Sequence, residues 1–398
     1  MEQWKQTPTS ANTGGIALPA GLAGTYAILI SFTQFFLPVF FEGDLGFSGA
    51  QIGLLYAGLS ITSVIASFPA GLSTDRITPR MVILGSLILL SAASAGLGIV
   101  RSFWVYLLVF ILFGTAINVF QISLYSHTFK ILDPERRGRG IGAFMAVRMI
   151  GFGLGTLGGG YLLMLLDFPK TLLLLAGGSL VMAAVCLALP RLPAAKTTLS
   201  EYRADFLRPK VLLFALWLFL FSSHWGAENT SYGLFLKKNL DLSLVGMGWY
   251  MTLEFVMFSA TAYVVGVMGD RGRSLSAILI AGLLLSGVGH LLMVIPILPV
   301  SLFFRALHGI GDGAVSIVMY LGVMRMFLPE RIGGNSGIVG LILMSGTLVG
   351  ALVFGPMGEH FGYALPLIVS GAVTLALIPF PLVAMKRKRA GQAADPVD

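Results

Sequence analysis

The second half of this chain repeats the first at a constant spacing of 195 residues. Asp75 and Arg76 recur as Asp270 and Arg271, and the agreement runs from position 71 to position 350 without a gap. The other matched pairs are Gly71 and Gly266, Gly114 and Gly309, Pro134 and Pro329, Glu135 and Glu330, Arg136 and Arg331, Gly138 and Gly333, Gly151 and Gly346, and Gly155 and Gly350. A repeat in register over this length predicts two copies of one structural unit with the same orientation.

Long apolar segments occupy most of both copies. Of the 398 residues, 56% are hydrophobic and only 11% are charged. An apolar segment of about 20 residues can cross a bilayer as a helix. We expect twelve spans, at 18–41, 50–72, 80–100, 103–127, 140–166, 170–190, 211–235, 245–268, 275–296, 299–324, 334–357 and 364–385. The sequence therefore predicts an all-α membrane protein with two six-helix bundles, residues 1–190 and 211–398, joined by a linker at 191–210.

Basic residues gather in alternate connections between these spans. The formal net charge of +8 could suggest a nucleic-acid partner, but the placement of the charges argues against one. One set of alternate connections is rich in basic residues and holds Lys5, Arg76, Arg80, Lys130, Arg136, Arg137, Arg139, the linker, Arg271, Arg273, Arg325, Arg331 and Lys386 to Arg389. The other set is poor in them and holds Arg101, Lys170, Lys237 and Lys238. By the positive-inside rule, the rich set and both termini are expected in the cytoplasm, as in a bacterial cytoplasmic membrane.

Two loops carry the same signature. The loop after the second span reads Gly71-Leu-Ser-Thr-Asp75-Arg76-Ile-Thr-Pro-Arg80, and the loop after the eighth reads Gly266-Val-Met-Gly-Asp270-Arg271-Gly-Arg273. Both resemble the G-x-x-x-D-R-x-G-R-R motif of the major facilitator superfamily, although Thr78 and Pro79 replace the usual Gly and Arg. The resemblance covers essentially the whole chain. It implies a secondary transporter that holds its substrate between two bundles, with no catalytic residue and no cofactor.

The same loops predict a conformational latch. A glycine at a helix end allows a neighbouring helix to approach, and a carboxylate there can bind the positive N-terminus of that neighbour. The residues expected to form the latch are Gly71, Asp75, Arg76, Arg80, Gly266, Asp270, Arg271 and Arg273. We expect these contacts to part when the bundles rock, and we expect the polar linker with its two prolines to act as a tether.

Charged side chains inside the predicted spans are costly and usually functional. On the tenth span, Arg305, His308 and Asp312 follow an i, i+3, i+7 spacing and share one helix face. This group is similar in character to the proton-coupling group on the same span of sugar–proton symporters. Together with Glu254 on the eighth span, these residues are the predicted proton-coupling group.

A count of the intramembrane charges supports a proton carrier. Asp312, Glu254 and Glu228 outnumber the two arginines, Arg305 and Arg148. One acid is therefore expected to hold a proton part of the time, since an unpaired buried carboxylate is costly. Asp312 and Glu254 lie nearest the middle of their spans, which makes them the two candidates.

Arg148 is the strongest candidate for a substrate contact. It lies near mid-membrane on the fifth span, and its repeat partner is Leu343, so the shared scaffold does not require it. Its fixed donors suit a carboxylate, a phosphate or a pair of sugar hydroxyls. The uncharged residues expected beside it are Gln34, Asn118, Gln121, Tyr125 and Tyr320. On the seventh span, His224, Trp225, Glu228 and Asn229 form a further polar patch, with a helix break expected near Gly226.

These observations leave several functions open. Paired arginines and acids favour proton-coupled transport of a small polar or anionic organic solute. Proton-driven efflux of amphipathic compounds or lipids is the alternative, supported by the glycine-rich fifth span, although Thr156 replaces the proline of the antiporter motif that it resembles. An intramembrane metalloenzyme and a transporter-like sensor explain fewer of the features. The expected partners are the substrate, protons and the lipid bilayer, with the chain acting as a monomer without a bound metal.

Overall fold

The computed structural model describes residues 15–381, which form helices joined by short connections and contain no strand. The helices are α1 (Ala17–Gly43), α2 (Gly49–Arg76), α3 (Pro79–Ile99), α4 (Phe103–Ile131), α5 (Arg137–Leu165), α6 (Phe168–Cys186), α7 (Leu199–Phe206), α8 (Pro209–Ala227), η2 (Glu228–Tyr232), α9 (Gly233–Lys238), α10 (Leu244–Asp270), α11 (Leu275–Leu292), α12 (Leu298–Met326), η3 (Pro329–Arg331), α13 (Ile332–Phe361) and α14 (Ala364–Ala376). Eleven helical segments of this part are long and apolar enough to cross a membrane, and α1 adds another long helix. The predicted all-α membrane fold is confirmed.

Local sequence signals start several of these helices. Ser48 caps α2 in a capping box with Gln51, and Ser243 and Ser274 accept from the first turns of α10 and α11. Asp167 caps α6 in the same way. A side-chain oxygen at these positions satisfies an N–H group that has no partner within the helix. The ends of the spans are therefore encoded locally, close to the positions expected from the apolar segments.

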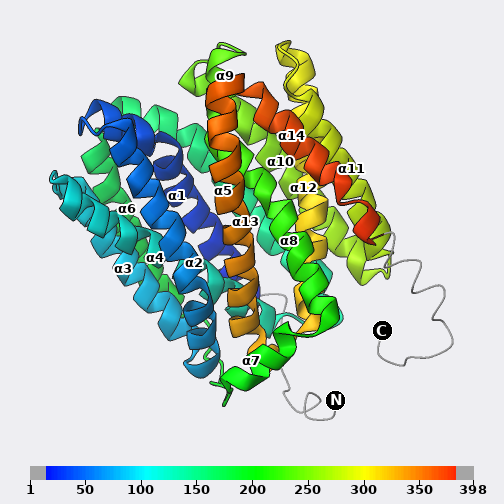
Figure 1. Cartoon of the computed structure of the whole chain (residues 1–398). Coiled ribbons are helices and arrows are strands. Elements are labelled where there is room, and N and C mark those ends of the chain that lie inside the picture. The colour runs from blue at the N-terminus through cyan, green and yellow to red at the C-terminus, as the bar shows by residue number, and fades with distance from the viewer. Residues whose placement is uncertain (1–14, 382–398) are drawn as a thin grey trace.

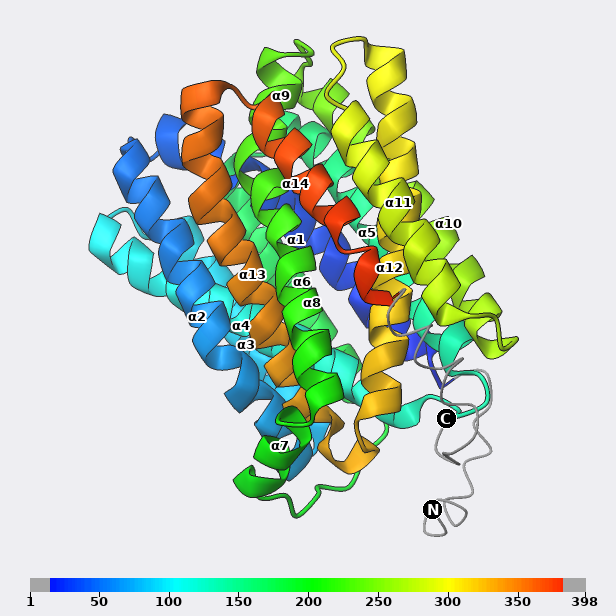
Figure 2. The ribbon, with the colours of Figure 1, turned by 45° about the vertical axis from the view of Figure 1, so that its right-hand side comes forward.

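The helices lie in two groups. Figure 1 shows α1 to α6, coloured blue to green, beside the second-half helices, coloured green to red, with the short helix α7 at one end of the molecule. The rotated view in Figure 2 leaves α7 at the same end. We call this end, which also carries Asp75 and Asp270, the linker side.

Glycines let the two halves touch closely at the linker side. A side chain at Gly71 would collide with the backbone of Gly333 on α13, and one at Gly266 would collide with the backbone of Gly138 on α5. These two contacts are repeat equivalents. Only glycine permits such a close approach of two helix backbones, so α2 packs on α13 and α10 packs on α5 in the same way.

The seventh span differs from its prediction. The chain does not break near Gly226 but continues from α8 through the π-helical turn η2 into α9. Gly226 serves packing instead, because a side chain there would collide with α13 at Gly350 and Ala351. A π-helical turn inserts an extra residue into the helix and re-aims the side chains that it carries, among them Glu228.

The linker is more ordered than a tether. Residues 199–206 form α7, which begins with a capping box between Thr198 and Glu201. Tyr202 and Asp205 on this helix are buried. The linker therefore packs on the transmembrane helices.

Candidate functional site

Helix α12 supplies the centre of a buried polar cluster within the second half. Arg305, His308 and Asp312 lie on one face of α12, as their spacing predicts, and all three are buried. Their partners come from four other elements, namely α8, η2, α10 and α11. We define the polar cluster as Arg305, His308, Asp312, His224, Glu228, Glu254, Ser286 and His290.

Arg305 forms ion pairs with two carboxylates at the same time. Its Nη1 donates to Glu228 Oε1 at 2.7 Å, and its Nη2 donates to Glu254. Its guanidinium also lies over the ring of Tyr232, 4.2 Å from the ring centroid. Since one arginine carries a single charge, it neutralises only one of the two carboxylates.

Asp312 has a different set of neighbours. Its Oδ1 accepts from Ser286 Oγ at 2.6 Å, while Oδ2 lies 3.2 Å from His224 Nε2 and 3.7 Å from His308 Nε2. The ring of His290 packs on that of His308, with centroids 4.7 Å apart. His224 and His308 thus lie beside Asp312, whereas Glu254 shares Arg305 with Glu228.

Arg148 lies outside this cluster. The sequence-based count set Arg148 and Arg305 together against three acids, but in the structure only Arg305 is among them. The polar cluster therefore contains three carboxyl groups and a single arginine. The excess of acid over base within the second half is larger than we expected, because the spacing of residues could not reveal which charges meet.

Arg148 forms a second polar centre, on α5. Its Nη2 donates to Gln121 Oε1 at 2.9 Å, and Gln121 Nε2 in turn donates to Tyr26 Oη at 3.0 Å. The guanidinium faces the rings of Phe152 and Tyr125, at 4.9 and 5.7 Å from their centroids. No acidic side chain among the described residues pairs with it within 4.0 Å.

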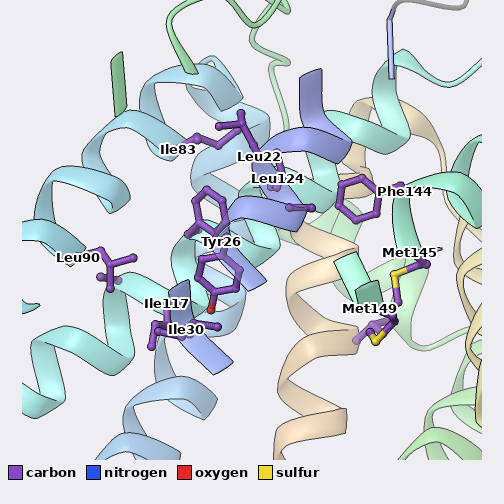
Figure 3. Close-up of a cluster of buried hydrophobic side chains, with 14 of the residues drawn as sticks. Leu22, Tyr26, Ile30, Ile83, Leu90, Ile117, Leu124, Phe144, Met145 and Met149 are labelled. Carbon is purple, nitrogen blue, oxygen red and sulfur yellow. The ribbon is translucent and has the colours of Figure 1, made fainter. Parts of the chain in front are cut away.

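A cavity of about 10 Å³ adjoins Arg148. It is lined by Ala23, Tyr26, Phe120, Gln121, Leu124, Tyr125, Phe144 and Arg148. This volume holds about one water molecule. Figure 3 shows the apolar packing that supports it, with Tyr26, Leu124 and Phe144 among the buried side chains of the first half. Tyr125 of α4 stacks on Tyr320 of α12 with centroids 5.1 Å apart, so one wall of this centre joins the two halves.

The other residues predicted to contact substrate have different positions. Asn118 donates to Ser63 O and Ser67 Oγ, which ties α4 to α2. Trp225 packs against His224 beside the polar cluster, and Asn229 is exposed on η2. The side chain of Gln34 lies outside the described part of the structure.

Asp75 joins the halves at the linker side. Its Oδ1 accepts from the backbone N–H of Gly333 at 3.0 Å and its Oδ2 from that of Gly334 at 2.7 Å, at the N-terminus of α13. Lys130 Nζ at 2.8 Å and the Tyr202 hydroxyl at 2.8 Å donate to the same carboxylate, which is fully buried. An anion at a helix N-terminus is stabilised by free N–H groups and by the helix dipole.

Asp270 makes the repeat-equivalent contact. It accepts from the backbone N–H groups of Gly138 at 2.6 Å and Arg139 at 2.8 Å, at the N-terminus of α5. Asp270 is exposed, and Arg325, the repeat counterpart of Lys130, is exposed as well. The two contacts therefore share their backbone geometry and differ in burial and in the number of donors.

The arginines of the two signature loops do not bridge the halves. Arg76 donates to Thr197 O in the linker, and Arg80 donates to Leu187 O at the end of α6. Arg271 and Arg273 are exposed. At these two loops, the two aspartates rather than the arginines form the hydrogen bonds to the opposite half.

The linker supplies contacts that we did not expect. Tyr202 donates to Asp75, and Asp205 accepts from Arg331 Nε at 2.9 Å and from Asn335 Nδ2 at 3.0 Å. Partial burial opposes ionisation of Asp205, but the hydrogen bonds from Arg331 and Asn335 outweigh it and lower the pKa of this carboxyl. The Thr198–Glu201 capping box is the sequence signal that could have revealed this helix.

The fold is that of a multi-pass membrane protein, and the family that its sequence matches consists of transporters rather than enzymes. The family model described as Major Facilitator Superfamily matches residues 20–235 and 216–396. The chain belongs to this superfamily, as the two signature loops predicted.

Relatives and solved structures agree with this assignment. The chain is 27% identical over 328 residues to the multidrug resistance protein MdtH of Aeromonas hydrophila, covering 80% of this chain and 81% of the relative. It superposes on the human organic anion transporter MFSD10 (TETRAN) with a TM-score of 0.74 at 18% identity, over 93% of this chain and 100% of that one. The proton:xylose symporter XylE gives a TM-score of 0.75 at 13% identity, over 94% and 96%. At these identities, the two structures establish the fold.

Proposed function

We propose that this transporter carries a small organic anion by proton-coupled alternating access, with Arg148 binding the anionic group. The observation that carries the proposal is an arginine within a membrane-spanning helix that has no acidic partner among the described residues. An unpaired charge at this depth is costly and usually serves a ligand or an ion.

The surroundings of Arg148 favour an anion over a neutral solute. A guanidinium offers five donors in a fixed fork, and Gln121 accepts from one of its nitrogens. Tyr26, Tyr125 and Tyr320 add aromatic surface and hydroxyl groups. In this arrangement the cavity is smaller than an organic molecule, so binding requires the aromatic walls to move apart.

The polar cluster is the proposed proton-coupling group. Arg305 pairs with Glu228 and Glu254 together, so one of these two carboxyls is in excess and a proton neutralises it. Glu254 is the more buried of the two, and we infer that it carries the proton. Asp312, the other candidate from the sequence, has histidines within reach instead.

We further propose that the linker side faces the cytoplasm and that Asp75 and Asp270 act as the conformational latch. The loops of the linker side are those rich in lysine and arginine. The contacts of both aspartates with helices of the opposite half close that side here. Opening toward the cytoplasm then requires both contacts to part.

The proposal is tested by binding measurements on purified protein in detergent. Thermal-shift screening against mono- and dicarboxylates, sugar phosphates, nucleosides and cationic dyes would select a ligand for calorimetry. Loss of charge-assisted hydrogen bonds of about 1.5–3 kcal/mol predicts that Arg148→Ala binds an anion about ten- to a hundredfold more weakly. Arg148→Lys is also expected to bind weakly, because it lacks the planar fork.

Arg101→Ala is the matched control, since Arg101 is exposed and lies in a loop of the poorly basic set. Parental affinity in both Arg148 variants would rule out the role of this residue. Selection of dyes and neutral solutes by the screen, with no anion bound, would reject the anionic substrate class.

Proton-driven efflux of amphipathic compounds is the second candidate. The relative of Aeromonas hydrophila carries the name of a multidrug resistance protein. The aromatic rings around Arg148 would also pack against apolar compounds. The same screen separates the two functions, because stabilisation by cationic dyes that survives Arg148→Ala favours efflux.

A further inference from the structure

We propose that His224, His308 and Asp312 form a binding site for one divalent transition-metal ion, of which Zn²⁺ is the best fit. The three side chains are buried, and their ligand atoms lie within 4.8 Å of one another. His224 belongs to α8, while His308 and Asp312 stand one turn apart on α12. Two imidazoles and a carboxylate are a ligand set that Zn²⁺ prefers. This inference stands independently of the proposed substrate.

Two of the three distances between the donor atoms are close to those around a single ion, and the third is within 4.8 Å. Asp312 Oδ2 lies 3.2 Å from His224 Nε2 and 3.7 Å from His308 Nε2. Zinc bonds of 2.0–2.2 Å in tetrahedral geometry place neighbouring ligand atoms about 3.3–3.6 Å apart. Small side-chain movements are therefore enough to bring all three atoms onto one ion.

The Nε2 atoms of both histidines are already oriented for metal binding, because the Nδ1 atoms are held by backbone carbonyl groups. His224 Nδ1 contacts Phe221 O, and His308 Nδ1 lies 3.0 Å from Ser286 O. A carbonyl oxygen only accepts, so Nδ1 carries the hydrogen in each ring and a neutral ring presents its Nε2 lone pair toward Asp312. Two lone pairs facing a carboxylate repel it, and a metal ion between them would remove this repulsion. In metal sites, the ring nitrogen that does not bind the metal commonly donates its hydrogen to a backbone carbonyl in this way.

Asp312 Oδ2 and His308 Nε2 are both available to bind a metal ion. Ser286 Oγ donates to Asp312 Oδ1, which leaves Oδ2 available to an ion. His308 Nε2 is fully buried and has no hydrogen-bond partner among the described residues. Glu228 Oε1 lies 3.3 Å from that nitrogen and accepts from Arg305 Nη1, so it remains with Arg305. An unsatisfied buried nitrogen is costly, and a metal bond removes that cost.

Metal titration of the full chain tests the proposal. The protein, freed of any histidine tag and treated with a chelator, is titrated with Zn²⁺ by calorimetry and with Co²⁺ by visible absorption, whose intensity reports four-coordinate geometry. We expect one ion per chain. Asp312→Asn and His308→Gln are each expected to bind the metal at least about tenfold more weakly. Even the loss of a residue that only hydrogen-bonds to a ligand lowers metal affinity about ten- to a hundredfold.

His127→Gln is the matched control, because His127 is a fully buried histidine of the first half, outside the polar cluster. It is expected to bind as the parent does. If Asp312→Asn does not fold, His224→Gln replaces it, since His224 is the remaining proposed ligand and the same loss of at least about tenfold is expected. Failure of the parent to take up one ion, or parental affinity in the ligand variants, would overturn the proposal. Protons on the two histidines would then be the cations of the site.

Discussion

Arg148 and Arg305 show how the surroundings of a residue decide its chemistry. Both are arginines within membrane-spanning helices. Arg305 contacts two carboxylates and an aromatic ring, and it is completely buried. Arg148 contacts an amide and two aromatic rings, with no acid within reach among the described residues. The first arginine neutralises protein charge, whereas the second has no acid to neutralise among the described residues.

Glu254→Gln tests the proton carrier at this scale. Glutamine imitates the protonated acid, so we expect proton-driven accumulation in proteoliposomes to stop while exchange of substrate across the membrane continues. Asp167→Asn, an exposed acid that caps α6, is the control and should accumulate substrate as the parent does. Accumulation against a gradient by Glu254→Gln would assign the proton to another acid of the polar cluster.

At the scale of elements, the linker helix α7 is part of the contact between the halves. Tyr202 reaches Asp75 of α2, and Asp205 reaches Arg331 and Asn335 at the start of α13. Among the described residues, the second loop has no equivalent of this helix. The linker side is therefore held more firmly at Asp75 than at Asp270.

Tyr202→Phe tests this role of α7. The change removes one hydrogen bond to a buried carboxylate and keeps the ring that packs on Phe68. A bond to a charged group contributes about 1.5–3 kcal/mol, so local opening of the linker should become about ten- to a hundredfold more frequent. Hydrogen exchange at residues 198–207 measures it. Tyr161→Phe on the exposed surface of α5 is the control, and equal protection in both variants would argue against the role.

At the scale of the whole molecule, the internal repeat produces two equivalent contacts of unequal strength. Asp75 and Asp270 each bind two backbone N–H groups, at Gly333 and Gly334 and at Gly138 and Arg139. Only Asp75 is buried and bound by a lysine and a tyrosine in addition. If the two aspartates act as the proposed latch, rocking of the halves breaks both contacts and the Asp75 contact opposes it more strongly.

Asp75→Asn should therefore open the linker side more than Asp270→Asn does. Ser259 of α10 is a suitable reporter position, because it is buried and donates to Ala146 O of α5 across the interface. In a Cys186→Ala background, Ser259→Cys should react with a thiol reagent at least about tenfold faster after Asp75→Asn, with a smaller gain after Asp270→Asn. The Asp270 variant is the internal comparison. Loss of folded protein without faster labelling would make Asp75 a folding anchor.

The sequence alone determined the class of this protein. Twelve apolar segments, the repeat and the signature loops predicted an all-α membrane fold and its superfamily, because each depends on residue type and spacing along one helix. The common face of Arg305, His308 and Asp312 was predictable for the same reason.

Only the tertiary structure decided which distant groups meet. It separated Arg148 from the acids and paired Arg305 with Glu228 and Glu254. It also brought His224 of α8 beside His308 and Asp312 of α12. It also docked the linker on Asp75 through Tyr202. These pairings depend on how helices are rotated and how closely they pack, and periodicity within one helix carries no information about the helix beside it.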